Sequence, residues 1–96
     1  MARLVLPDVL THAQAAGAAR MLAQALRASG QPHAVVDASA LEHFDSSALA
    51  VLLDARRDAL ALGMTFGVSG MPARLRALAS LYGVEPLLPA EGSRSA

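Results

Sequence analysis

The chain has 96 residues, a formal net charge of zero and no cysteine. This length suits a single domain with one hydrophobic core, and the lack of cysteine excludes disulfides and thiolate metal sites within it. The eight basic residues, all Arg, form no concentrated patch, so nucleic-acid binding is not expected. Neither a signal peptide nor a membrane-spanning helix is recognisable. We therefore expect a cytoplasmic chain that reaches a membrane only through a partner.

The first half of the chain reads as strand, helix, strand. A short apolar run at residues 4–6 predicts a strand. Alanine-rich sequence with helical spacing predicts a helix over residues 12–28, with Thr11 as its cap and Gly30 after its end. A β-branched pair within residues 34–36 then predicts a central strand.

The second half repeats the alternation. Helical spacing predicts a helix over residues 46–62, ended by Gly63, and a strand follows at residues 64–68. A third helix is expected over residues 72–82, because proline suits a first helical turn. Residues 84–88 are expected to add a short last strand.

The helix faces can also be predicted from spacing. Four leucines of the second helix share one face and are expected to point inward: Leu49, Leu52, Leu53 and Leu60. Two apolar residues lie off that face and would suit a docking patch: Val51 and Leu62. Four residues of the third helix are expected inward: Leu75, Leu78, Ala79 and Tyr82.

Alternating strands and helices predict an α/β sandwich with a mixed, mostly parallel sheet of about four strands and helices packed on it. We expect one domain over residues 1–89. Residues 90–96 are small and polar, which predicts a disordered C-terminal tail.

The junction before the second helix carries the polar sequence Asp45-Ser46-Ser47. A helix N-terminus has free backbone N–H groups and a positive partial charge. Ser46 can therefore simply cap the helix, or the junction can present a polar surface to a partner or a phosphoryl group. Asp45 is interpreted as an orienting or capping residue, and His43 as either a solvated loop residue or part of the partner surface.

No catalytic or metal-binding set can be assembled from the sequence. The three histidines, His12, His33 and His43, have no partners at metal-ligand spacing. No glycine-rich phosphate loop and no nucleophile–base pair is visible. We therefore expect a protein that is not an enzyme and that uses no cofactor or metal.

With these motifs in place, the chain resembles the STAS family, small domains of sulphate transporters and anti-sigma-factor antagonists. The similarity rests on residues 45–49 (Asp-Ser-Ser-Ala-Leu), on the helix, Gly63 and strand that follow, and on residues 78–83 (Leu-Ala-Ser-Leu-Tyr-Gly) leading to Pro89. It covers about residues 3–89. Within the family, the closing segment is most similar to the MlaB-type subunits of bacterial Mla phospholipid transporters.

The resemblance implies a non-enzymatic subunit that binds and supports the ATPase of a phospholipid-transporting ABC system, and through it the permease, maintaining outer-membrane lipid asymmetry. The alternative is an anti-sigma-factor antagonist switched by phosphorylation of Ser46. That residue aligns with the phosphorylated position of such antagonists and with a hydroxyl position important in MlaB-type subunits. The implied partner-binding or phosphorylatable residues are His43, Asp45, Ser46, Ser47 and Val51.

Two departures from the family pattern stand out. Ala48 occupies a position where the family usually has glycine, which would make the turn less permissive. The usual first edge strand is also not recognisable, so a sheet edge would be left bare. Pairing with a partner or formation of a homodimer would then cover it.

Overall fold

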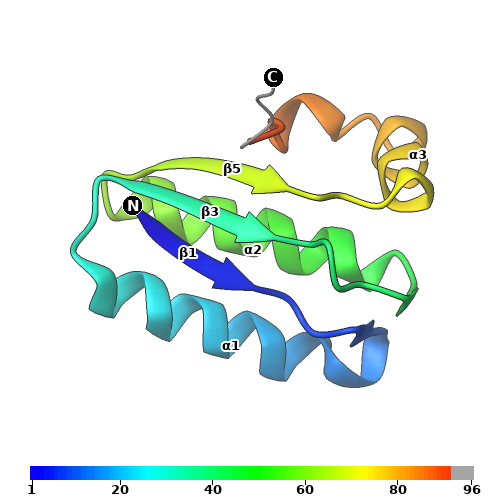
Figure 1. Ribbon diagram of the computed structural model, residues 1–96, viewed down its shortest axis with the longest axis horizontal. Coiled ribbons are helices and arrows are strands. Elements are labelled where there is room, and N and C mark those ends of the chain that lie inside the picture. The colour runs from blue at the N-terminus through cyan, green and yellow to red at the C-terminus, as the bar shows by residue number, and fades with distance from the viewer. Residues whose placement is uncertain (92–96) are drawn as a thin grey trace.

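The structure is a computed structural model and describes residues 1–91. It confirms the predicted alternation of strands and helices (Figure 1). The elements are β1 (Ala2–Val5), β2 (Val9–Leu10), α1 (His12–Ser29), β3 (His33–Asp37), β4 (His43–Phe44), α2 (Ser47–Ala61), β5 (Thr65–Ser69), α3 (Ala73–Leu81) and the 3₁₀ helix η1 (Glu85–Leu87).

Two details of this order differ from the prediction. The two-residue strands β2 and β4 were not predicted, because two residues carry no periodicity. The strand expected over residues 84–88 is wrong, since η1 forms there instead. Pro86 lies in the first turn of η1, where its fixed φ suits a helical turn and its missing N–H is no loss.

The strands form two separate sheets, and all their pairings are parallel. The main sheet has the order β1-β3-β5, with Ala2 opposite Ala34 and His33 opposite Thr65. Strands β2 and β4 pair as a second, two-stranded unit. The α/β class with parallel strands is therefore confirmed. In place of the expected single sheet of about four strands, the structure has a sheet of three strands and a separate pair of strands. The outer edge of β1 carries no strand from residues 1–91.

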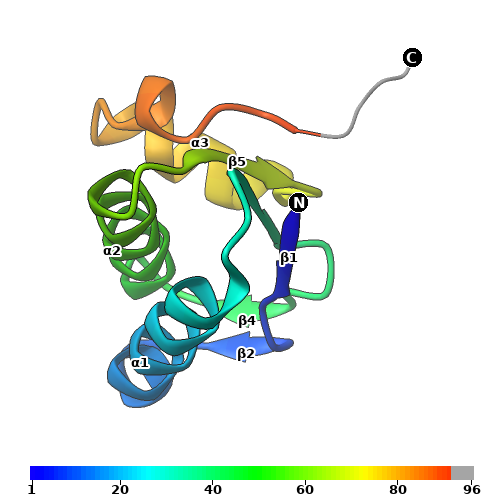
Figure 2. The ribbon, with the colours of Figure 1, turned by 90° about the vertical axis from the view of Figure 1, so that its left-hand side faces the viewer.

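Helices α1 and α2 lie side by side on one face of the main sheet (Figure 2). The core between these helices and the sheet is mainly aliphatic. Each large apolar side chain removed from water there contributes about 1.5–3 kcal/mol. The largest fully buried side chains are Leu6, Leu10, Leu22, Leu26, Val35, Val36, Val51, Leu52 and Leu75.

Three predicted side-chain orientations are wrong. Val51 is only 2% exposed, so it belongs to the core and not to an outward patch, whereas Leu60 is 49% exposed. Because α2 packs against α1, β5 and α3, its buried surface is wider than the single leucine stripe. Tyr82, expected inward, is 58% exposed because it caps the C-terminus of α3 beyond the last packed turn.

The end of the chain departs from the predicted tail. Ala90 forms a parallel bridge with Val68 of β5, and Glu91 continues along the same edge. These two residues are therefore part of the fold. The remainder of the predicted tail, residues 92–96, lies outside the described residues.

Candidate partner-binding site at the paired helix N-termini

The N-termini of α1 and α2 are brought together by the small β2–β4 unit. Strand β2 runs directly into α1, and β4 runs through Asp45 and Ser46 into α2. Because β2 and β4 pair in parallel, with Val9 opposite His43, the two helices begin side by side (Figures 1 and 2). Two helix N-termini with positive partial charge therefore meet at one surface.

Asp45 contacts the start of both helices, although α1 also has the predicted N-cap Thr11, whose backbone N–H donates to the Gln14 side chain in a capping box. Its Oδ1 accepts a hydrogen bond from the backbone N–H of Ser47 at 2.8 Å, in the first turn of α2. Its Oδ2 accepts one from the backbone N–H of His12 at 3.2 Å, the first residue of α1. The hydrogen bond from Ser47, helped by that from His12, holds the pKa of Asp45 below its ordinary value. The capping role expected of Asp45 is confirmed and extends to a second helix.

Ser46 does not cap α2, so the simple capping interpretation of this residue is wrong. Its backbone is already helical (φ −62°, ψ −15°), and its side chain accepts no capping hydrogen bond from the first turn of α2. The residue is exposed, and within residues 1–91 its hydroxyl has no hydrogen-bond partner. Because Asp45 supplies the cap, the Ser46 hydroxyl is free to bind another molecule.

The other predicted site residues divide into three groups. His43 is exposed on β4, and Ser47 is half-buried as the first residue of α2, so both lie beside Ser46. Val51 is buried one turn further along α2 and cannot contact a partner directly. Ala48 is fully buried with a negative φ, so the turn needs no glycine there.

Sequence reasoning missed one contact at this surface, between Arg74 of α3 and Phe44 of β4. The guanidinium carbon of Arg74 lies 4.3 Å from the centroid of the Phe44 ring, within the range of a cation–π interaction. Its Nη2 also donates to the carbonyl oxygen of Phe44 at 3.5 Å. Thirty residues separate the two, and no local pattern marks such a pair. Arg74 thus fixes the backbone that leads into Asp45 and Ser46.

The groups at this surface can form hydrogen bonds with another molecule. It combines a free hydroxyl, two positive helix ends, the cation of Arg74 and one carboxylate whose oxygens are engaged. The Ser46 hydroxyl can donate or accept a hydrogen bond from a docked partner, and it can accept a phosphoryl group. No group of three or more His, Asp or Glu residues suited to a metal ion occurs within residues 1–91.

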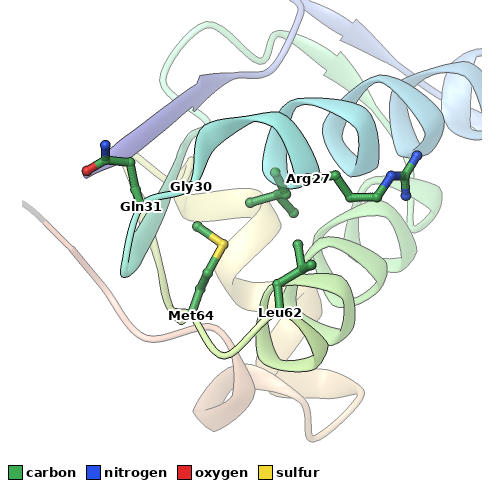
Figure 3. Close-up of a pocket in the computed structure, with 6 residues that line it drawn as sticks. Arg27, Gly30, Gln31, Leu62 and Met64 are labelled. Atoms are coloured by element: carbon green, nitrogen blue, oxygen red, sulfur yellow. The ribbon is translucent and has the colours of Figure 1, made fainter.

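A small cavity lies at the opposite ends of the same two helices. It has a volume of about 190 Å³ and lies where α1 and α2 end, between Arg27, Gly30, Gln31, Leu62 and Met64 (Figure 3). Of the residues predicted to form a docking patch, Leu62 lines this cavity. Leu62, which was expected to point away from the leucine face, is 46% exposed at its rim.

None of the helices in residues 1–91 combines the length and the apolar character needed to cross a membrane.

Comparison with known proteins identifies the family. No curated protein matches the chain. A STAS domain protein from Planctomyces limnophilus is similar in structure, with a TM-score of 0.78 and 14% identity over 96% of this chain and 82% of the other. A putative anti-sigma factor antagonist from Thermotoga maritima gives a TM-score of 0.77 and 15% identity over 95% and 80% of the two chains. The anti-sigma factor antagonist SpoIIAA in its unphosphorylated form gives 0.72 and 14% over 96% and 82%.

At these low identities, similarity to the solved structures is evidence for the fold alone. They confirm the predicted STAS-like architecture, a mostly parallel sheet with three helices. A family model described as "Mlab, STAS domain" matches residues 2–89. That match spans nearly all of the chain, which therefore belongs to the STAS domain family.

Proposed function

We propose that this chain is a non-enzymatic STAS subunit of a phospholipid-transporting ABC system of the Mla type. It binds the cytoplasmic ATPase subunit and supports its assembly and activity. It is held at the inner membrane through that subunit and the permease.

The observation that carries the proposal is the free hydroxyl of Ser46 at the paired helix ends. Asp45 accepts a hydrogen bond from one N–H at the start of each helix, so the Ser46 hydroxyl is not needed for either contact. An exposed polar group that is not needed by the fold is a good candidate for a contact with a partner. The description of the family model, "Mlab, STAS domain", supports a subunit of the Mla type.

The test is recovery of the partner from native membranes. The full chain, tagged at its C-terminus, is expected to retain an ABC ATPase together with its permease in mild detergent. The Ser46→Asp variant, equally folded, serves as the matched control and is expected to lose both. Retention of a kinase-type anti-sigma factor without a transporter ATPase would overturn the proposal.

The second candidate is an anti-sigma-factor antagonist, which the exposed Ser46 hydroxyl and the similarity of fold to such antagonists both favour. In this function a kinase would phosphorylate Ser46. The added phosphate carries about −1.5 to −2 charges and would sit at two positive helix ends beside the carboxylate of Asp45. Incubation with ATP and the co-purified partner, followed by intact mass measurement, distinguishes the two functions: a gain of one phosphate at Ser46 favours the antagonist.

A further inference from the structure

The outer edge of β5 is covered by the chain's own C-terminal segment, residues 89–91. The backbone N–H of Val68 donates to the carbonyl of Pro89 at 2.9 Å, and the N–H of Glu91 donates to the carbonyl of Val68 at 2.8 Å. Ala90 lies between them as the bridge partner of Val68. These are the bonds that an extended peptide makes when it adds to a parallel sheet edge.

The side chain of Glu91 is held on the face of the sheet away from α1 and α2. Its Oε1 lies 2.9 Å from Nε2 of His33 on the neighbouring strand β3, and Nδ1 of the same ring contacts Oγ1 of Thr65. The contact with Thr65 of β5 orients the His33 ring so that Nε2 faces the Glu91 carboxylate. The contact of the carboxylate extends from the segment past β5 to His33 on β3, and it holds the segment at Glu91.

Gly67 provides the space for Glu91. A Cβ at Gly67 would lie 2.9 Å from Cβ of Glu91 and would also clash with its Oε1, and the nearest atoms around it all belong to Glu91. Gly67 is not among the glycines with positive φ, so the backbone itself would accept alanine here. The glycine therefore matters for the passage of the Glu91 side chain.

We propose that the outer edge of β5 is a docking site for an extended peptide strand bearing a carboxylate, and that residues 89–91 occupy it in cis. Val68 supplies the backbone hydrogen bonds, Gly67 admits the acidic side chain, and His33 binds its carboxylate. The segment acts as a strap that keeps other strands off this edge. This inference does not depend on the Ser46 surface or on the transporter partner.

The strap is short, so its hold rests on few contacts. Two backbone hydrogen bonds and one partly exposed contact between His33 and Glu91 are weak individually, since a single hydrogen bond contributes only about 0.5–1.5 kcal/mol net. Attachment to the same chain raises the effective concentration of the strap to about the millimolar range. A separate peptide should therefore compete only after the strap has been weakened.

Amide hydrogen exchange in the full chain provides the first test. In the wild type, the N–H groups of Val68 and Glu91 are expected to be protected. Gly67→Ala should accelerate the exchange of the Val68 amide by about tenfold or more while leaving core amides such as that of Leu52 unchanged, because only local opening is affected. Equal exchange of Val68 in the wild type and in Gly67→Ala would overturn the strap.

A peptide with the sequence of residues 87–91, blocked at both ends, provides the second test. We expect the full-length Glu91→Ala chain to bind it about two- to tenfold more tightly than the wild type, with NMR shifts at Val68 and His33, because the competing strap is weakened. The Glu91→Ala, Gly67→Ala double variant and a peptide with Ala in place of Glu are the matched controls, and both should lose binding. Equal binding by the double variant, or no binding by Glu91→Ala, would overturn the docking site.

Discussion

The carboxylate of Asp45 accepts a hydrogen bond from the backbone N–H of His12 at 3.2 Å, although 33 residues separate them in the sequence. The same carboxylate caps α2 through Ser47, so one side chain ties the starts of two helices together. Because Asp45 makes these hydrogen bonds, the Ser46 hydroxyl is not required to cap α2. This arrangement also makes the stability of the fold and the availability of the Ser46 hydroxyl separable by mutation.

Substitution of Asp45 should therefore cost stability, and substitution of Ser46 should not. Asp45→Ala leaves one N–H at the start of each helix, those of His12 and Ser47, without a partner, so we expect its melting temperature to fall by several degrees. Ser46→Ala removes a hydroxyl that bonds to nothing in residues 1–91 and should melt like the wild type. Circular dichroism melts of the two variants check this; a larger loss in Ser46→Ala than in Asp45→Ala would contradict the assignment of the cap.

Stability should fall in acid, through two carboxylates. The pKa of Asp45 is lowered by the hydrogen bond from Ser47, and that of Asp37 by hydrogen bonding from Ser39, with help from the charge of Arg3. Because each folded-state pKa lies below the ordinary value of 3.8, the unfolded chain binds protons more tightly. Their contribution is thus complete above that value and is lost as the pH falls through the lowered pKa values.

Urea unfolding between neutral and strongly acidic pH measures this dependence. The Asp45→Asn, Asp37→Asn double variant is expected to show a flatter loss of unfolding free energy below pH 3.8 than the wild type. An unchanged slope in the double variant would assign the acid sensitivity to other groups.

The two faces of α2 give a prediction for the core. Leu52 is fully buried and Leu60 is 49% exposed. Leu52→Ala should lower the free energy of unfolding by about 2–5 kcal/mol, because it removes buried atoms and leaves a cavity. Leu60→Ala, the same change on the same helix, should stay within about 0.5 kcal/mol, as exposed substitutions do. Similar losses in both variants would mean that α2 packs by its leucine stripe after all.

Leu52 and Leu60 also show how much of the fold could be predicted from the sequence. Periodicity predicted each long element to within a few residues, because the spacing of apolar side chains and the glycine after each helix are local signals. It misplaced Val51, Leu60 and Tyr82, because the width of a buried face depends on how many elements pack against a helix.

The candidate site was predicted only in part, for a similar reason. The Asp-Ser-Ser junction could be located from its position before α2. The second contact of Asp45, with the start of α1, could not be predicted, since it depends on the distant N–H of His12. The contacts of Arg74 with Phe44 and of Glu91 with His33 likewise join segments far apart in the chain.

Arg74 should matter for the order of the site more than for global stability. Arg74→Ala removes the cation over the Phe44 ring, and we expect a loss of about 0.5–1 kcal/mol, typical of an exposed cation–π pair. NMR shifts should change at Phe44, Asp45 and Ser46. Arg76→Ala removes another exposed arginine from α3 and serves as the control. If Arg76→Ala perturbs the same signals equally, the effect belongs to helix charge and not to the stacking.

The sharpest test of the proposed interface is a charge at Ser46. The side chain of Ser46 is exposed, so Ser46→Asp should keep the fold, and the positive ends of α1 and α2 offset part of the repulsion from Asp45. Its melting temperature should stay close to that of the wild type. At a partly desolvated contact, however, the new carboxylate would be an unpaired charge that costs several kcal/mol, on the order of 2–5, in binding. A loss of that size weakens binding of the ATPase subunit by about thirtyfold or more.

Ser46→Ala loses only a shared hydrogen bond and should show a milder defect, about tenfold or less. Titration of the purified partner against the three proteins compares these affinities directly. Tight binding by Ser46→Asp would place the interface away from these helix ends, whereas equal loss in Ser46→Ala and Ser46→Asp would show that the hydroxyl itself, rather than the absence of charge, is what the partner requires.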